Sequence, residues 1–272
     1  MIVYRLLPQH NHKAQGFSPL KCAGSVCESR ARIQFGGSNL VFLLNKRLSW
    51  IPDLRDEKLL GVEFGSGAGI TKLLIPGSKV ISTDILHSSW LDIGGVDATS
   101  TVFPDATFDY IFINNVLHHL AKPNEFFKEA KRILKPSGRL YIQEIHTSLF
   151  MRLILKLTNH ESYDSKTNAL FQSEPLSDPD DPWDANCDIA RQLFDNPSAF
   201  KEVHSGWQII KDKKTEFLTF LNSGGVVVTA PHVPLPKLVS SLIWTIDSFL
   251  VKLFPNILGL QRQLVLVKTA DC

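Results

Sequence analysis

Three glycines stand within five residues directly after an apolar run, in the segment VEFGSGAGITKLL from Val62 to Leu74. Glycine inside a regular element costs roughly 0.5–1 kcal/mol relative to alanine, so something at this point must require bare backbone. The preceding KLLGVEF (58–64) has the pattern of a short buried strand, and the following ITKLLIP has the pattern of a helix stopped by Pro76. A glycine turn between a strand and a helix lets a ligand touch the main chain and directs helix N–H groups toward it.

The alternation of strand and helix continues along the chain. The apolar runs predict further strands at 79–85, 108–115 and 139–146, a helix at 38–51, and a turn at 135–138. The stretch VLHHLAKPNEFFKEAKRIL predicts helix with a break near Pro123. Late in the chain we expect a strand-like segment at 206–221, a helix at 236–254 and a last strand at 262–269. This order favours an α/β fold with a parallel sheet covered on both faces.

The sequence suggests four segments of different character. We expect an N-terminal arm and helix at 1–57, poorly regular up to about residue 37, a core at 58–150, an acceptor-side insertion or lid at 151–205, and strands and a helix completing the sheet at 206–272. Within the insertion, residues 159–187 are polar and rich in Pro and Asp. A long stretch without periodicity is usually a lid, a binding insertion or a disordered segment.

Composition excludes several classes of function. The 272 residues carry a net charge of +2 without basic runs, so we expect no nucleic-acid partner. The four cysteines form no CxxC pair, which argues against a zinc site or a disulfide framework and favours the cytoplasm. The N-terminal apolar run is too short for a signal peptide. The apolar stretch near the C-terminus is interrupted by Asp247, Lys252 and Pro255, so we expect no membrane span there, but either a core helix or a face for a lipid-linked acceptor.

The glycine turn selects among ligand classes. A phosphate-binding P-loop would require GxxxxGK[ST], and the lysine is missing. A dinucleotide fingerprint would require GxGxxG, and Ile70 stands at its sixth position. What remains is an acidic residue, Glu63, two places before Gly65, Gly67 and Gly69.

In this pattern the sequence resembles the class I S-adenosylmethionine-dependent methyltransferases, of the type 11-like kind. VEFGSGAG matches their first motif, and further matches follow in order in VISTDI, VDATSTVFPDATFDYIFINNVLHHL, EAKRILKPSGRLYI and IQE, together covering about residues 58–146. Ser137 stands where a second glycine is usual. The resemblance implies a Rossmann-like, seven-stranded, mostly parallel sheet with helices on both faces, an antiparallel last strand and an insertion after strand five.

The resemblance also implies a set of cofactor-binding residues. Asp84 ends the second strand, where its carboxylate can accept both ribose hydroxyls, and the alternative is an ordinary loop aspartate. Asp97 would accept the adenine amino group, or it would only cap a helix. Glu63 would orient the turn or meet the ammonium of the amino-acid tail, and the full expected set is Glu63, Gly65, Ser66, Gly67, Asp84, Ile85, Asp97, Ala98 and Asn114.

Catalytic candidates follow the fourth strand and lie in the insertion. His118 is expected to face the cleft as a base or an orienting group, since histidine titrates near neutral pH, whereas His119 is expected to be structural. NHESYD offers His160, Glu161 and Asp164, either as an acceptor pocket or as a solvated loop. These segments, with DPWDANCDI and FLNSGG, resemble methyltransferases encoded among bacterial glycan or secondary-metabolite genes. We expect no resident metal, because one His–Glu pair is a weak ligand set.

The sequence therefore predicts an S-adenosylmethionine-dependent methyltransferase acting in biosynthesis on a small-molecule or glycan acceptor, through an in-line displacement with oxygen as the expected acceptor atom. Two alternatives stay open. One is a nicotinamide-dependent oxidoreductase on a similar sheet, and the other is an S-adenosylmethionine-binding protein that does not methylate. The acceptor and the oligomeric state cannot be read from the chain.

Overall fold

The computed structural model describes residues 26–35, 37–159, 161–227 and 229–269. They build one seven-stranded sheet in the order β3-β2-β1-β4-β5-β7-β6. All neighbours pair in parallel except β7, which runs antiparallel to both β5 and β6. The strands are β1 (Gly61–Phe64), β2 (Val80–Asp84), β3 (Ile93–Gly94), β4 (Phe108–Asn114), β5 (Leu134–Ile145), β6 (Trp207–Thr215) and β7 (Gln261–Lys268). The expected mostly parallel sheet with an antiparallel last strand is confirmed.

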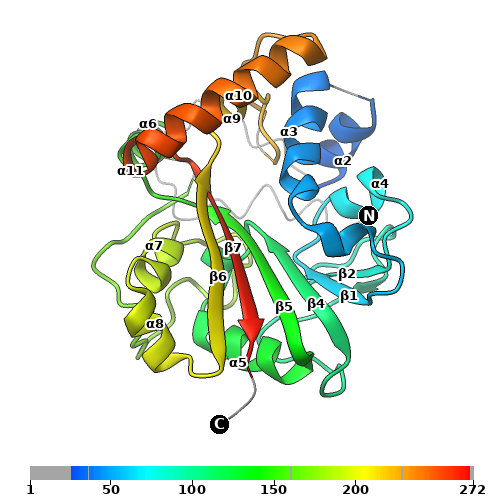
Figure 1. The fold of residues 1–272 in the computed structure, drawn as a ribbon, viewed down its shortest axis with the longest axis vertical. Coiled ribbons are helices and arrows are strands. Elements are labelled where there is room, and N and C mark those ends of the chain that lie inside the picture. Colours follow the sequence, from blue (N-terminus) through cyan, green and yellow to red (C-terminus); the bar gives the residue numbers. More distant parts are fainter. Residues whose placement is uncertain (1–25, 36, 160, 228, 270–272) are drawn as a thin grey trace.

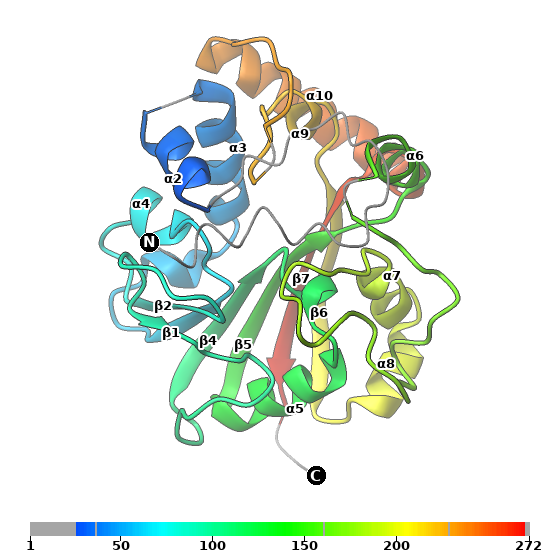
Figure 2. The ribbon, with the colours of Figure 1, turned by 180° about the vertical axis from the view of Figure 1, so that it is seen from behind.

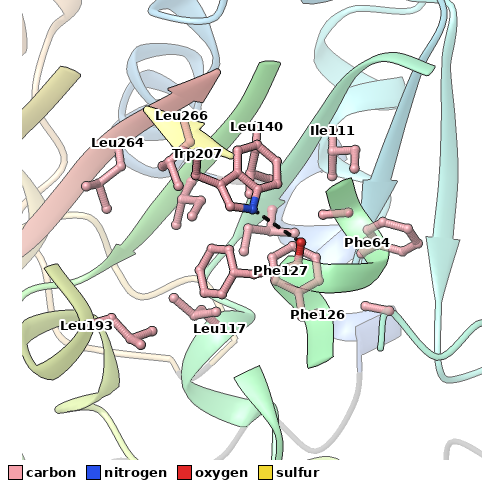
Figure 3. Packing of buried hydrophobic residues seen from close by; sticks show 14 of the residues in the cluster. Phe64, Ile111, Leu117, Phe126, Phe127, Leu140, Leu193, Trp207, Leu264 and Leu266 are labelled. Atoms are coloured by element: carbon pink, nitrogen blue, oxygen red, sulfur yellow. Dashed lines mark hydrogen bonds between the residues drawn. The ribbon is translucent and has the colours of Figure 1, made fainter. Parts of the chain in front are cut away.

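One face of the sheet is covered by α5 (Pro123–Ile133), α7 (Ile189–Phe194) and α8 (Pro197–Val203), as Figure 2 shows. Along β4 the side chains alternate, so Ile111 and Ile113 point into this layer. Figure 3 shows the layer's centre, where Trp207 packs among aliphatic side chains and its indole N–H donates to the Phe127 carbonyl at 3.3 Å. The hydrogen bond satisfies the one polar atom that this large side chain buries.

The opposite face carries the N-terminal helices. Tyr110 and Phe112 of β4 pack there with Leu48, at the end of α3 (Ser38–Ser49), and with Leu54 of η2 (Pro52–Arg55). Beyond α3, the helices α2 (Val26–Phe35) and α4 (Ile70–Leu74) share a smaller apolar cluster around Leu44. Helices therefore cover both faces of the sheet, as expected.

A further layer of helices lies beyond the carboxyl ends of the parallel strands (Figure 1). It contains α6 (Leu149–Thr158), which follows β5, then α9 (Leu218–Leu221), α10 (Lys237–Leu253) and α11 (Pro255–Leu258), which lie between β6 and β7. Within this layer α10 packs on α9 and α11, and α11 packs on α6, while α10 also packs on α3 of the N-terminal helices. The short η3 (Leu117–His119) follows β4 at the same end of the sheet.

Three local expectations need correction. Residues 26–35 form the helix α2, although we expected an irregular arm as far as residue 37, and the expectation for 1–25 lies outside the described residues. The strand-like pattern at 206–221 ends at Thr215, and α9 follows it. The predicted turn at 135–138 is an irregular part of β5, in which Ser137 has a φ of 62° and the register against β4 shifts.

The division into four segments stays a prediction, as does the role of the insertion as a lid. None of the helices within the described residues is both long enough and apolar enough to cross a lipid bilayer.

Candidate active site

The turn after β1 requires glycine for two separate reasons. Gly65, Gly67 and Gly69 have φ values of 66°, 47° and 68°, which L side chains rarely adopt. At Gly65 a Cβ would also lie 2.3 Å from Cγ2 of Val116, so a side chain would collide. Among the described residues and apart from chain neighbours, a Cβ at Gly67 would meet only the Gly65 carbonyl oxygen, 4.0 Å away. That edge of the turn is therefore open to a ligand that contacts main chain.

Two side chains that the sequence did not single out clamp the turn. The Trp90 indole N–H donates to the Gly67 carbonyl at 2.9 Å, and Nη1 of Arg30 donates to the Ala68 carbonyl at 2.7 Å. The Arg30 guanidinium lies 5.0 Å from the Trp90 ring centroid, within cation–π range. Both hydrogen bonds join residues far apart in sequence, so no local sequence pattern predicts them.

Glu63 lies directly before the turn with 3% of its surface exposed. Its Oε1 accepts a hydrogen bond from the Thr71 hydroxyl at 2.8 Å, whereas its buried Oε2 has no partner among the described residues. Burial raises the pKa of Glu63 to about 7, more than the hydrogen bonds from Thr71 and Ser66 lower it. An unpartnered carboxylate oxygen next to a glycine turn is suited to a cationic group.

The neighbouring strand offers oxygens of the same kind. Asn114 ends β4, which pairs with β1, and its Oδ1 is buried without a partner among the described residues. Oδ1 of Asn115 is likewise buried without a partner among the described residues. Asn115 has a φ of 53° and does not cap η3, whose N-cap is Val116. Buried acceptors without partners are rare in folded proteins, so three of them on adjacent strand ends point to a ligand that donates hydrogen bonds.

Asp84 fastens the end of β2 to the glycine turn. Its Oδ2 accepts from the Gly67 N–H at 2.8 Å, and its Oδ1 accepts from the Leu86 N–H at 2.9 Å. Burial raises the pKa of Asp84, and these backbone hydrogen bonds oppose the rise. Each carboxylate oxygen has a second lone pair, so the predicted contact with ribose hydroxyls is compatible with this role. Beside it, the Ser66 N–H is satisfied by the Thr83 carbonyl at 2.9 Å.

The other predicted cofactor residues lie farther along this edge. Ile85 follows Asp84 and is 48% exposed. Oδ1 of Asp97 accepts from the Thr99 N–H at 2.8 Å and from the Thr99 hydroxyl at 2.7 Å, so this side chain organises a local turn. Ala98 is buried in the core beneath that turn. The predicted contacts with the adenine ring stay predictions.

His118 is held by a buried carboxylate. Its Nδ1 lies 2.5 Å from Oε1 of Glu144 at the end of β5, and 1% of the His118 surface is exposed. Glu144 also accepts from the N–H groups of Leu117 and Ile145, at 2.8 and 2.7 Å. Burial alone would lower the pKa of His118, but Glu144 and then Glu161 outweigh it, and the pKa is raised. With Nδ1–H directed at Glu144, the neutral ring presents the Nε2 lone pair on its other side.

The insertion brings Glu161 to that other side. Oε2 of Glu161 lies 3.8 Å from Nε2 of His118 and accepts from the Cys187 thiol at 3.3 Å. Burial, with Glu161 adding to it, raises the pKa of Cys187 well above its ordinary value, so this cysteine is a thiol. The structure thus joins two of the three predicted catalytic residues, His118 and Glu161. The third, His160, lies outside the described residues.

His119 is part of the same cluster but faces a different partner. Its Nδ1 lies 3.1 Å from the Asp184 carbonyl, and burial and the neighbouring His118 lower its pKa to about 4. The ligand atoms of His118, His119 and Glu161 lie within 4.8 Å of one another, so a divalent cation could bind there, although the sequence led us to expect none.

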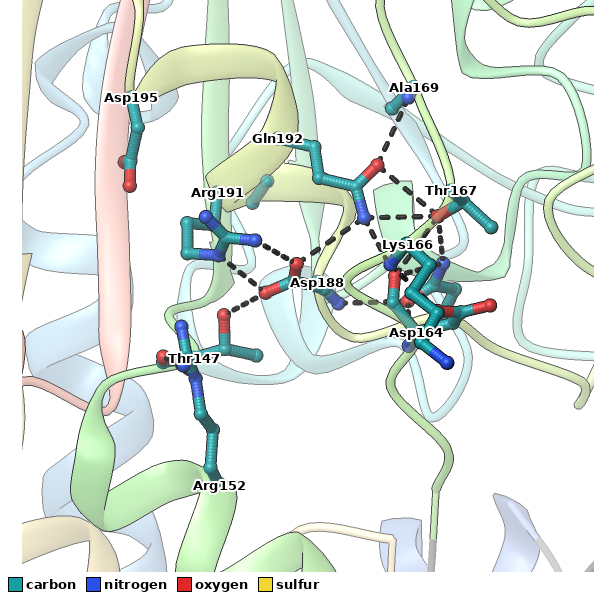
Figure 4. Close-up of polar contacts among 12 residues, drawn as sticks. Thr147, Arg152, Asp164, Lys166, Thr167, Ala169, Asp188, Arg191, Gln192 and Asp195 are labelled. Atoms are coloured by element: carbon teal, nitrogen blue, oxygen red, sulfur yellow. Dashed lines mark hydrogen bonds and ion pairs between the residues drawn. The ribbon is translucent and has the colours of Figure 1, made fainter.

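Within the insertion, polar contacts fix the loop before α7 to that helix, as Figure 4 shows. Gln192 donates to the Asp164 carbonyl at 2.7 Å and accepts from the Ala169 N–H at 3.0 Å. Asp188 accepts from the Thr147 hydroxyl at 2.5 Å. The exposed Asp164 side chain accepts from the Lys166 N–H at 2.8 Å, so the structure gives it a local role in its loop. Glu161 is therefore presented by an anchored segment.

Residues 62–142 match the family model of the methyltransferase domain. This stretch contains the glycine turn, Asp84, Asp97, Asn114 and His118. It is a class I S-adenosylmethionine-dependent methyltransferase domain. S-adenosylmethionine is accordingly the cofactor that this methyltransferase domain takes.

Two curated proteins are similar to parts of the chain. Demethylmenaquinone methyltransferase of Clavibacter sepedonicus is 29% identical over 110 residues, covering 36% of this chain and 44% of that protein. The biotin biosynthesis bifunctional protein of Cellvibrio japonicus is 28% identical over 117 residues, covering 39% of this chain and 23% of that protein. The matches thus span less than half the length of either relative.

A solved structure shares the methyltransferase fold over nearly the whole chain. A methyltransferase from Thermotoga maritima superposes with a TM-score of 0.51 at 18% identity and covers 90% of this chain and 96% of its own. A methyltransferase from Archaeoglobus fulgidus has a TM-score of 0.49 at 18% identity and covers 88% of this chain and 98% of its own. The likeness to the Thermotoga maritima structure supports the fold expected from the sequence.

The observed site fits S-adenosylmethionine. Its amino-acid tail carries an ammonium, which the unpartnered oxygens of Glu63 and Asn114 can accept, and the open edge at Gly67 admits close contact with main chain. The sequence missed Glu144 and Cys187 as parts of the site. The segment IQE (142–144) indicated the end of a strand, and the acidic residue at that end was the one sequence signal that could have identified Glu144.

Proposed function

We propose that the protein transfers the methyl group of S-adenosylmethionine to a hydroxyl of a small-molecule or glycan acceptor, with His118 as the general base. The observation that carries the choice of base is the buried Glu144–His118 pair, in which Nδ1 of His118 meets Glu144 and Nε2 faces Glu161 of the insertion at 3.8 Å.

When bound, S-adenosylmethionine supplies an electrophilic methyl group on a sulfonium, which is a good leaving group. Around it, Glu63, Asn114 and the open edge at Gly67 hold the tail, and Asp84 holds the ribose. The chain's main task is to align the acceptor with the breaking bond.

His118 handles the proton that the acceptor hydroxyl loses. As the oxygen forms its bond to carbon, the proton moves to Nε2 of His118, and the Glu144 carboxylate stabilises the imidazolium. Glu161, 3.8 Å from Nε2, favours the same charged state and lies where it can orient the acceptor. The acceptor hydroxyl, which takes the methyl group, and His118, which takes the proton, thus lie together at the carboxyl ends of β4 and β5.

The free thiols of Cys27 and Cys187 agree with a reducing compartment, and we place the reaction in the cytoplasm.

The test combines cofactor titration with product analysis on the full chain. We expect binding of S-adenosylmethionine but not of NADH, and formation of S-adenosylhomocysteine together with an O-methylated product from a panel of hydroxylated small molecules and glycans. NADH binding without S-adenosylmethionine affinity would contradict the proposal. Binding of S-adenosylmethionine with a product formed without S-adenosylhomocysteine would show a different use of the cofactor.

A further inference from the structure

The outer sides of α6, α10 and α11 form the apolar face, an exposed row of large aliphatic and aromatic side chains. On α10 the spacing is helical along one side, with Leu238 85% and Phe249 62% exposed. On α6 the row repeats every four residues. The apolar face consists of Leu149, Leu153, Leu157, Leu238, Leu242, Ile246, Phe249, Leu253, Phe254 and Ile257.

The side of α10 that faces the protein is the more polar one. Its buried residues are Ser240, Asp247 and Val251. Asp247 accepts from the N–H groups of Leu218 and Thr219 at 2.9 and 2.7 Å, which caps α9. A helix of a globular protein normally buries its apolar side, so α10 has the reverse orientation.

The exposed charges of these helices have one sign. Lys156 of α6 and Lys237 and Lys252 of α10 are exposed, and Arg152 of α6 is half-buried. Asp247 is the sole acidic residue in the three helices, and it is 1% exposed. Helices with Leu and Phe on one side and lysines beside them are typical of segments that lie in a membrane interface.

The apolar face lies at the same end of the molecule as the candidate site (Figures 1 and 2). β5 ends at Ile145, directly after Glu144, the partner of His118. α6 begins four residues later. A surface bound through this face would therefore lie beyond the carboxyl ends of the parallel strands, on the acceptor side of the fold.

We propose that the apolar face binds in the interface of an anionic lipid bilayer, with α6 and α10 lying along its plane. Aliphatic and aromatic side chains would enter the boundary of headgroups and acyl chains, and the lysines would meet anionic headgroups. This orientation would present the site to an acceptor carried on a lipid. That extension rests on the proposed function, whereas lipid binding does not.

The experiment is sedimentation of the full chain with vesicles of phosphatidylcholine alone or mixed with phosphatidylglycerol, without cofactor or acceptor. Each exposed lysine contributes roughly fivefold near an anionic surface, so we expect the mixed vesicles to bind on the order of 100-fold more tightly. High salt should remove most of this difference.

Matched variants separate the apolar and charged contributions. Phe249→Ser should weaken binding to the mixed vesicles roughly tenfold, because an inserted aromatic side chain is lost. Phe171→Ser, at a position equally exposed (63%) but on the insertion, should bind as the parent does. Lys237→Glu should weaken binding to mixed vesicles and leave binding to phosphatidylcholine unchanged. All three positions are exposed, and thermal unfolding will show that the variants fold.

Absence of binding to both kinds of vesicle would overturn the proposal, as would equal binding by Phe249→Ser and the parent. A dimer in gel filtration that Phe249→Ser dissociates, without vesicle binding, would assign the face to contact between copies. Titration with S-adenosylmethionine is read separately: unchanged affinity in Phe249→Ser is expected, and lost affinity in the parent would remove the proposed function alone.

Discussion

The cofactor half and the acceptor half of this molecule are built in different ways. The cofactor half, at the ends of β1, β2 and β4, depends on backbone conformation. It contains glycines at positive φ, a carboxylate that accepts from an N–H of the turn, and buried acceptors that have no partner in the part of the chain the structure describes. The acceptor half depends on long-range side-chain contacts, such as those that join Glu161 to His118 and Gln192 to the Asp164 carbonyl. Backbone requirements restrict which residues can occupy a position, so the cofactor half is easier to predict from the sequence than the acceptor half.

The largest expected effect is on the proton transfer that links the two halves. His118→Ala should lower turnover by about 10²–10⁴-fold, because general-base catalysis is worth that much. Affinity for S-adenosylmethionine should stay within about threefold, since the glycine turn is untouched. His119→Gln is the matched control and should keep most of the activity. Steady-state kinetics beside a binding titration measure both, and full activity of His118→Ala would remove it from the mechanism.

A bound metal would change that outcome in a recognisable way. If His118, His119 and Glu161 held a required cation, His119→Gln would inactivate the enzyme as strongly as His118→Ala. Chelation with EDTA would do the same to the parent. We expect neither, because His118 acts as a base in this account.

The next effect lies within the cofactor half and depends on pH. The pKa of Glu63 is about 7 in the folded chain against 4.5 as its ordinary value. The folded state therefore holds the proton more tightly, and stability falls as pH rises from about 4.5 to about 7, by about 3 kcal/mol in total. Urea unfolding at pH 5 and pH 8 should show most of this loss in the parent, and Glu63→Gln should largely abolish it. An unchanged difference in the variant would show that other groups cause it.

A smaller effect tests the contact between β2 and the cofactor. Asp84→Ala should weaken S-adenosylmethionine binding by about 1–3 kcal/mol, through lost hydrogen bonds to a charged acceptor. Asp164→Ala, an aspartate of the acceptor half, should leave cofactor affinity unchanged. Calorimetric titration compares the two, and equal effects of both substitutions would abolish the distinction between the halves.

The smallest effect concerns the anchoring of the insertion. Gln192→Ala removes the hydrogen bonds to the Asp164 carbonyl and the Ala169 N–H, which should cost about 1 kcal/mol of local stability. Amide hydrogen exchange in residues 161–170 should become faster, while cofactor affinity stays the same. Unchanged exchange would mean that apolar packing around Leu170 holds the segment.

The sequence predicted most of the sheet and the position of the glycine turn, whereas the roles of the cofactor-binding residues stay predictions. The pattern of Val62 to Leu74 predicted the glycine turn between a strand and a helix. The antiparallel last strand was also expected and is confirmed. Trp90, Arg30 and Cys187 could not be found, because each acts through a residue distant in sequence. The orientation of α10 was also hidden: an apolar helix pattern does not tell whether its apolar side faces the core or the outside.

The most direct test is a structure of the full chain with S-adenosylmethionine bound. We predict that the amino group of its tail lies within hydrogen-bond distance of Oε2 of Glu63 or Oδ1 of Asn114, with main chain at Gly67 in contact. A bound cofactor that leaves both oxygens without partners, or a pyrophosphate seated on the turn, would contradict the account.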